Sequence, residues 1–108
     1  MKSFKLNEMT KGWFVGDFSP VALKTTESEV AIKQYKAGEI ELEHVHKVAT
    51  EVTVIVSGRV RMFKQEWGAG DIIVIDPNES TAFEALEDTI TVVVKTPSVA
   101  GDKYIVEK

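Results

Sequence analysis

The stretch that does most to define this chain is Gly38-Glu-Ile-Glu-Leu-Glu-His44-Val-His46-Lys-Val-Ala-Thr-Glu51-Val-Thr-Val-Ile-Val-Ser-Gly58, which contains its only two histidines. His44 and His46 are two residues apart, so on an extended strand both imidazoles point to the same side. Glu51 follows five residues later. Two imidazoles and one carboxylate facing one point form a donor set that suits first-row transition metals. We therefore predict a divalent metal site with His44, His46 and Glu51 as ligands, for iron, manganese, nickel or zinc.

The rest of the chain consists of short runs rich in β-branched and aromatic residues, separated by glycine, proline, asparagine and aspartate. No segment shows a convincing helical periodicity. The runs predict strands at Gly12–Phe18, Val30–Lys36, Glu41–His46, Glu51–Ser57, Val60–Lys64, Ile72–Ile75, Thr81–Ala85, Thr89–Lys95 and Lys103–Val106. Regularly spaced short strands are typical of an antiparallel sandwich or barrel. We expect an all-β protein with a single domain over residues 1–108.

One predicted strand carries an apolar face on the side opposite to Glu51, formed by Val52, Val54 and Val56. A sheet with one solvated face normally alternates with polar residues, so this outer face is expected to be covered. Two covers are open: a partner subunit in a homodimer, or the N-terminal segment with its aromatic residues Trp13, Phe14 and Phe18. By contrast, Arg59 and Arg61 alternate on a strand in the manner of a solvated face, and Glu39, Glu41, Glu43 and Glu84 are read in the same way.

Composition excludes several classes of function. The chain has 108 residues, no cysteine and a formal net charge of −4, so disulfide frameworks, thiolate metal sites and cysteine nucleophiles are excluded. Its charges are interspersed and no basic stripe is present, so nucleic-acid binding is not expected. No apolar run approaches the roughly 20 residues of a membrane span, and the N-terminus lacks the apolar run of a signal peptide. We expect a cytoplasmic protein that does not bind membranes.

The histidine stretch resembles the first motif of the cupin superfamily. That motif is a glycine, five residues, His-x-His, four residues, a glutamate, six residues and a glycine, and residues 38–58 match each of these positions. The second cupin motif is outlined by residues 70–85, but with departures. Asp76 stands in place of a proline, Asn78 in place of a glycine, and Thr81 in place of the histidine that serves the family as fourth metal ligand. Asparagine tolerates a left-handed backbone, so the turn can survive.

The resemblance implies a cupin-type double-stranded β-helix, a jelly-roll barrel of two antiparallel sheets, with the metal inside. A neutral threonine hydroxyl is a poor transition-metal ligand, so the implied site keeps three protein ligands and open positions for water or substrate. Thr81 is expected to face this site and can hold a metal-bound water. Phe83 has the same parity and should line the same pocket. Of Gln34 and Tyr35, which are neighbours on one strand, one should line the pocket.

Three classes of function are compatible with these features. The first is a metal-binding cupin that acts on a small polar metabolite, a sugar or an organic acid, by Lewis-acid or oxygen chemistry. The second is a non-enzymatic ligand-binding or sensor domain, which the missing fourth histidine favours. The third is a structural domain without metal, whose apolar valine face mediates assembly. Because unrelated functions share one fold, the resemblance alone does not choose among them.

Overall fold

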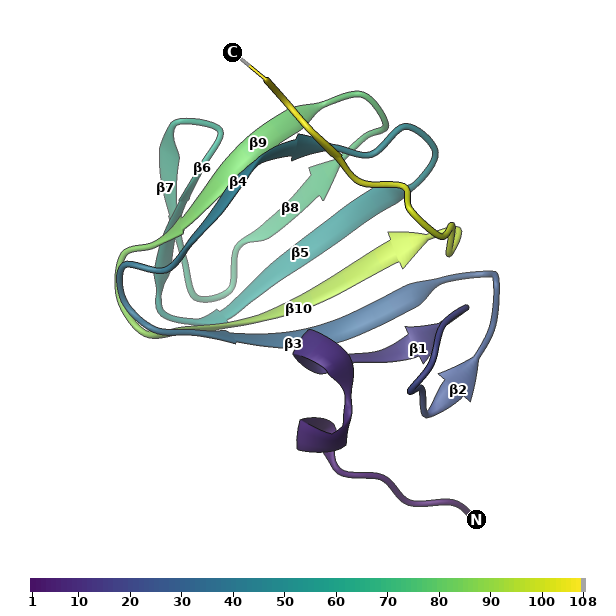
Figure 1. The fold of residues 1–108 in the computed structure, drawn as a ribbon. Helices are drawn as coiled ribbons and strands as arrows, with labels where there is room; N and C mark the ends of the chain where they lie inside the picture. Colours follow the sequence, from purple (N-terminus) through teal and green to yellow (C-terminus); the bar gives the residue numbers. More distant parts are fainter. Residues whose placement is uncertain (108) are drawn as a thin grey trace.

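The computed structural model describes residues 1–107, and this part of the chain is almost entirely β-structure (Figure 1). Two short 3₁₀ helices come first, followed by strands connected by short turns. The elements are η1 (Leu6–Glu8), η2 (Thr10–Gly12), β1 (Trp13–Gly16), β2 (Leu23–Lys24), β3 (Glu29–Tyr35), β4 (Ile40–Val45), β5 (Thr50–Ser57), β6 (Arg59–Met62), β7 (Gln65–Gly68), β8 (Ile72–Ile75), β9 (Ser80–Ala85), β10 (Thr89–Thr96) and β11 (Tyr104–Ile105).

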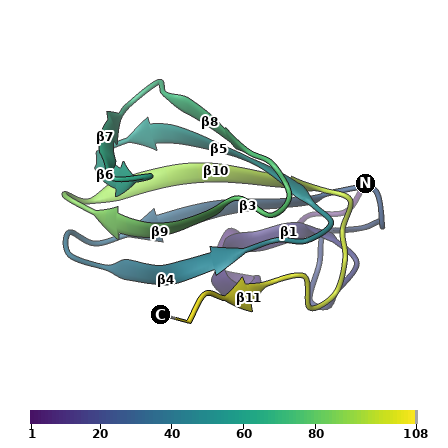
Figure 2. The same ribbon diagram turned by 90° about the horizontal axis from the view of Figure 1, so that it is seen from above.

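The strands form two sheets that face each other as layers, as Figure 2 shows from above. One sheet has the order β2-β1-β3-β10-β5-β8 and the other the order β11-β4-β9-β6-β7. All pairs are antiparallel apart from β1 with β2. Consecutive strands repeatedly cross between the sheets, which is the jelly-roll arrangement. The predicted all-β, two-sheet double-stranded β-helix is thus confirmed.

The inner faces of the two sheets meet in an apolar core. It consists of Ile55, Val60, Met62, Ile73, Ile75, Phe83 and Ala85, all less than a tenth exposed. These residues alternate along their strands with outward-facing ones, as the two-residue period of a strand requires. Along β5 the inward positions change from Ile55 to the polar Thr53 and Glu51, and β10 adds the inward Thr91 and Lys95; these polar residues line the site described below.

The strand predictions differ from the structure most clearly around β6 and β7. The predicted strand Val60–Lys64 ends at Met62, because Phe63 and Lys64 adopt left-handed backbone conformations with φ of 51° and 59°. They form a two-residue hairpin loop, after which Gln65 pairs with Met62. The usual Asn-Gly signal for such a loop is absent, so β7 was missed. The two-residue strand β2 was missed as well.

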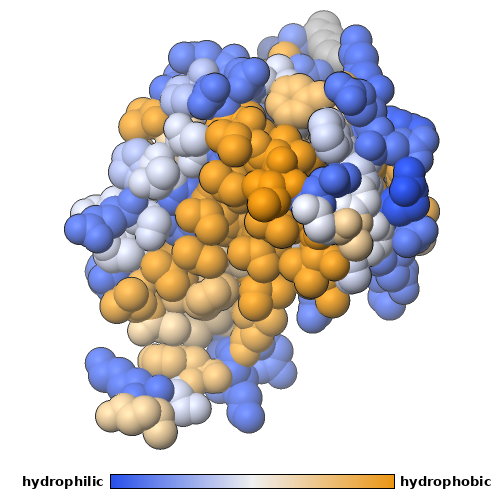
Figure 3. Space-filling view, turned by 180° about the vertical axis from the view of Figure 1, so that it is seen from behind, coloured by the Kyte–Doolittle hydropathy of each residue, from blue (hydrophilic) through white to orange (hydrophobic). Residues whose placement is uncertain are grey.

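The outer face of the six-stranded sheet is a broad apolar surface (Figure 3). Strand register aligns it in two rows, Val74, Val52, Val94 and Val30 in one row and Ile72, Val54, Val92 and Ile32 in the other. The N-terminal segment does not fold across the valine face of β5, because β1 pairs with β3 and extends the same sheet. That alternative was therefore wrong. Val56, Ile72 and Val74 remain more than half exposed.

Among residues 1–107, every helix is too short or too polar to cross a membrane.

Candidate metal centre and its cavity

The end of β4 brings both histidines to the inner side of the barrel by means of a change in strand register. Glu41 lies opposite Phe83 of β9 and His44 opposite Thr81, so three steps along β4 correspond to two along β9. This is a β-bulge, and it shifts the parity of the strand. Glu41 and His44 consequently both line the interior, while Leu42 is exposed. The expectation that Glu41 belongs to a solvated face was therefore wrong, because the bulge reverses it.

Hydrogen bonds fix the orientation of both imidazole rings. Nδ1 of His44 lies 2.9 Å from the carbonyl oxygen of Leu42, and Nδ1 of His46 lies 2.5 Å from that of Asp102. A carbonyl can only accept, so each Nδ1 carries a proton and donates it. In the neutral tautomer each Nε2 then has a free lone pair, which is the usual arrangement of a metal-binding histidine.

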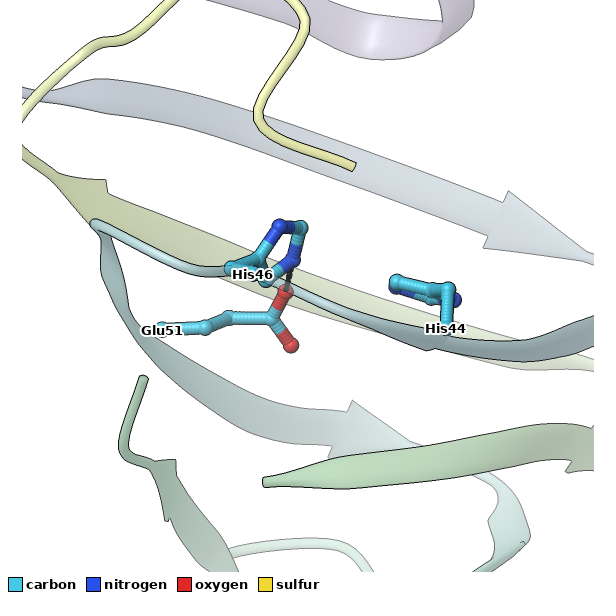
Figure 4. A group of neighbouring side chains, drawn as sticks. All are labelled: His44, His46 and Glu51. Carbon is cyan, nitrogen blue, oxygen red and sulfur yellow. Dashed lines mark hydrogen bonds and ion pairs between the residues drawn. The ribbon is translucent and has the colours of Figure 1, made fainter. Parts of the chain in front are cut away.

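Glu51, at the start of β5, points its carboxylate toward His46 (Figure 4). Its Oε1 lies 3.2 Å from Nε2 of His46, and its Oε2 accepts a hydrogen bond of 2.9 Å from the hydroxyl of Thr53. One ligand atom from each of His44, His46 and Glu51 falls within a set separated by no more than 4.8 Å. Among residues 1–107, these three are the histidine and carboxylate side chains whose ligand atoms lie close enough together to bind one metal ion.

The electrostatics of the three groups differ. The hydrogen bond to Glu51 raises the pKa of His46, although burial opposes it. Burial lowers the pKa of His44, in spite of the bond to Leu42. Burial would raise the pKa of Glu51, but the bonds from His46 and Thr53 outweigh it and lower the value. Without a cation, the carboxylate and the His46 imidazolium thus compensate each other. A divalent ion can replace the proton between them, so the donor set fits a metal.

The loop between the histidines and Glu51 is held by a residue far away in sequence. The carboxylate of Asp102, 6% exposed, accepts hydrogen bonds from the backbone N–H groups of Lys47, Val48 and Ala49 at 2.8, 3.2 and 2.9 Å. Burial opposes ionisation, but these three donors lower the pKa of Asp102. Since its carbonyl also orients His46, Asp102 fixes both the loop and the ring.

The triad lies on the wall of a cavity of about 370 Å³ inside the barrel. Three of the residues predicted for the pocket, Tyr35, Thr81 and Phe83, line this cavity. Gln34 is exposed on the other side of β3 and is not among the lining residues. Tyr35 donates a hydrogen bond of 3.1 Å to Glu41, and its ring packs at a tilt of 36° against that of Phe83, with 4.4 Å between the ring centroids.

Thr81 occupies the position of the missing fourth ligand, but its hydroxyl is already engaged. Oγ1 accepts the backbone N–H of Phe63 at 2.8 Å and donates to the carbonyl of Ala82 at 2.7 Å. The hydroxyl proton is therefore committed to the backbone. The expectation that Glu84 points away from the site agrees with the structure, because Glu84 pairs with Arg61 at 3.1 Å on the exterior.

Several cavity residues were missed by sequence reasoning. Thr53 shares the face of Glu51 on β5, so its parity was a usable signal. Lys33, Lys95 and Thr91 reach the cavity only through the pairing of β3 with β10, which no local pattern reveals. Nothing in the sequence around Asp102 indicates its role.

The sequence matches no family model and no curated protein. Solved structures, in contrast, are similar. A protein with a double-stranded β-helix domain from Klebsiella pneumoniae is 23% identical, with a TM-score of 0.74 over 99% of this chain and 93% of its own. The DMSP lyase DddQ from Ruegeria pomeroyi is 14% identical, with a TM-score of 0.72 over 87% of this chain and 49% of its own. The nucleoside dehydratase Pac13 is 18% identical, with a TM-score of 0.65 over 77% and 71%.

At these identities the similarity concerns the fold. Together with the strand order, it shows that the chain folds as a small double-stranded β-helix.

Proposed function

We propose that this protein binds a divalent transition metal through His44, His46 and Glu51, and acts on a small polar metabolite in the cavity beside it. The observation that carries the proposal is the convergence of three ligand atoms within 4.8 Å of one another, with Nδ1 of each histidine bonded to a backbone carbonyl so that Nε2 is the atom directed at the site. A structural ion pair would not need the second imidazole. The identity of the metal, among iron, manganese, nickel and zinc, stays open.

A metal held by three protein ligands retains positions for a ligand, and it supplies Lewis acidity toward a carbonyl or carboxylate oxygen. The chain's own residues prepare the surroundings. Thr53 orients Glu51 by its hydrogen bond. Burial and the neighbouring Glu41 raise the pKa of Tyr35, so its phenol stays protonated and serves as a hydrogen-bond donor. Phe83 and Met62, both buried, form part of an apolar wall that limits access of water.

Two further observations support a small-metabolite ligand. A cavity of about 370 Å³ is of the size that small-molecule sites have in proteins. Structures with this fold include a lyase, DddQ, and a nucleoside dehydratase, Pac13, of which variants are described with uridine. Both names denote chemistry on small molecules. The predicted cytoplasmic location and the absence of nucleic-acid partners stay predictions.

Elemental analysis of protein purified without a metal-binding tag tests the proposal. The parent is compared with His44→Ala/His46→Ala, with Glu51→Gln, and with Glu87→Gln as a matched control at an exposed glutamate. We expect near-stoichiometric metal in the parent and in Glu87→Gln after reconstitution, and none in the double variant. Metal should also raise the melting temperature of the parent, because it binds the folded state. Equal metal content in the parent and the double variant would contradict the proposal.

We further propose that the protein is a homodimer that pairs through the outer face of the six-stranded sheet. The two rows of valine and isoleucine on this face contain no charged side chain, so a second copy of the same surface is a suitable cover. A two-fold axis through the sheet would bury both copies at once. Large exposed apolar patches of this kind are typical of interaction surfaces.

Sedimentation velocity distinguishes the dimer from a monomer. Val54→Glu places a charge at the centre of the surface and should give a folded monomer. Ile40→Glu is the matched control, because Ile40 is 64% exposed and belongs to the other sheet. A parent protein that sediments as a monomer at micromolar concentration would contradict the dimer without affecting the metal proposal.

A further inference from the structure

Two lysines point into the barrel from the inner face of the six-stranded sheet. The side chains of Lys33 on β3 and Lys95 on β10 are only 14% and 15% exposed, and both line the cavity that contains the metal triad. An ammonium group removed from water is costly unless partners compensate it. The partners of these two lysines therefore indicate what each is for.

Lys95 has a complete set of partners. Its Nζ lies 3.1 Å from Oε1 of Glu29, whose other oxygen accepts a hydrogen bond of 2.8 Å from Ser98. The ammonium also faces the ring of Trp13, 5.0 Å from the centroid. This arrangement is a structural ion pair.

Lys33 lacks such a set. Its Nζ lies 4.0 Å from Oε1 of Glu41, which is beyond hydrogen-bonding distance. Its ammonium also lies 5.4 Å from the centroid of the Trp13 ring. Burial lowers the pKa of Lys33, although Glu41 opposes this. The side chain of Lys33 is thus largely covered, while its ammonium reaches the cavity without a hydrogen-bond acceptor in the protein, and a bound anion would supply one.

Thr91 provides a second, independent indication at the same place. It lies directly opposite Lys33 in the pairing of β10 with β3, so their Cβ atoms are about 5 Å apart. Thr91 is 1% exposed and lines the same cavity. Within residues 1–107, its Oγ1 is the buried side-chain polar atom that has no hydrogen-bond partner. Buried hydroxyl groups are rarely left unpaired, and a ligand is one explanation for an exception.

These groups lie on the same inner face of the six-stranded sheet as Glu51 of the triad. Lys95 lies opposite Glu51 across β10 and β5, and Thr91 lies on the same face of β10. The cavity is lined by four lysines (Lys11, Lys33, Lys95 and Lys103) and four glutamates (Glu29, Glu41, Glu51 and Glu79). Their formal charges cancel, so a divalent ion would leave the cavity with an excess of two positive charges. An anionic ligand would reduce this excess.

We propose that Lys33 and Thr91 form an anion subsite, which binds the carboxylate of a small ligand whose other polar end reaches the metal. This inference rests on the proposed function only for the second end of the ligand, the polar end that reaches the metal. A carboxylate is favoured over a doubly charged phosphate, because Lys33 is the largely covered lysine of the cavity without a hydrogen-bond acceptor, whereas Lys95 is paired with Glu29 and Lys11 and Lys103 are exposed to solvent. The substrate class is accordingly a carboxylic acid with a second oxygen donor, rather than a neutral sugar.

Calorimetric titration with malonate, succinate and glutarate tests the subsite, with the uncharged diamide of succinate as a control. Each titration is done on metal-free and on metal-loaded protein, and quenching of Trp13 fluorescence reports occupancy beside Lys33. Trp13→Phe identifies the signal against that of Trp67. We expect the dicarboxylates to bind, the diamide not to bind, and one chain length to be preferred in the metal-loaded form.

Lys33→Met should weaken dicarboxylate binding at least about tenfold, because a hydrogen bond to a charged group is lost. The exposed Lys36→Met is the matched control and should change nothing. Thr91→Val should also weaken binding, while leaving the melting temperature equal or higher, since it removes a hydroxyl that has no partner in the protein. A purely structural threonine would instead lower the melting temperature.

Equal dicarboxylate affinity in the parent, Lys33→Met and Thr91→Val would overturn the subsite, and so would the absence of binding in both forms. Metal affinity, measured separately on the same variants, should be unchanged. If the triad binds no metal, the proposed function fails, but the effect of Lys33→Met on the metal-free protein still decides about the subsite.

Discussion

Asp102→Ala is the substitution whose effect follows most directly from the geometry around the metal loop. The carboxylate accepts three backbone N–H groups from the loop that separates His46 from Glu51. Ala49 is 3% exposed, so water cannot replace its lost acceptor, whereas Lys47 and Val48 are exposed. A charge-assisted bond to a buried donor contributes about 2 kcal/mol and the two solvated bonds about 0.5 kcal/mol each. We expect the free energy of unfolding of Asp102→Ala to be lower than that of the parent by about 3 kcal/mol.

The same substitution should weaken metal binding, because the loop positions both ends of the triad and the carbonyl of Asp102 orients His46. Loss of such outer contacts typically costs about 10- to 100-fold in metal affinity. The stability is measured by urea unfolding of metal-free protein, and the affinity by competition with a chromophoric chelator. Both measurements are needed, since a change in stability alone would show only a structural role.

Asp88→Ala is the matched control. Asp88 accepts one solvent-exposed hydrogen bond of 2.9 Å, from the backbone N–H of Ala37. It lies just before the start of β10, whereas Asp102 lies after the end of that strand. The Asp88→Ala variant should lose less than about 1 kcal/mol of unfolding free energy and keep the metal affinity of the parent. The reasoning is refuted if Asp102→Ala is no less stable than Asp88→Ala, or if it binds metal as tightly as the parent.

Two further predictions concern the glycine turn and the missing ligand. Gly58→Ala should destabilise the protein by more than about 2 kcal/mol, since its φ is +95° and a Cβ would lie 2.3 Å from Oγ1 of Thr89. Gly70→Ala, with φ +90° but open space around it, should cost only about 1 kcal/mol; equal urea midpoints for the two variants would contradict this. Thr81→His should raise metal affinity at least about tenfold by adding a fourth ligand, even though the acceptor for Phe63 is lost. Chelator competition would show an unchanged or weaker affinity if Thr81 does not face the metal.

The sequence was most informative where the chemistry is local. His44, His46 and Glu51 lie within eight residues of one another, so strand parity and spacing were enough to predict that they converge. Parity failed at Glu41, because a bulge between Glu41 and His44 leaves no signature in the residue types. A single inserted residue reverses the face of everything before it.

The remaining parts of the cavity depend on contacts between distant segments. Lys33 and Thr91 are 58 positions apart in sequence and become neighbours only through the register of β3 with β10. Asp102 reaches the metal loop from the C-terminal segment, across a separation of 53 to 55 residues. Such pairings are set by the closure of the whole barrel, which single-strand patterns do not determine. The wholly apolar valine face of β5, by contrast, could be predicted from strand parity alone.

The most direct test of the metal centre is diffraction from crystals of reconstituted protein, measured on both sides of the absorption edge of the added metal. We predict one anomalous peak per chain inside the barrel, about 2.0–2.2 Å from Nε2 of His44, Nε2 of His46 and a carboxylate oxygen of Glu51. A fully reconstituted crystal with no peak at these three atoms, or with the metal only on the surface, would contradict the account.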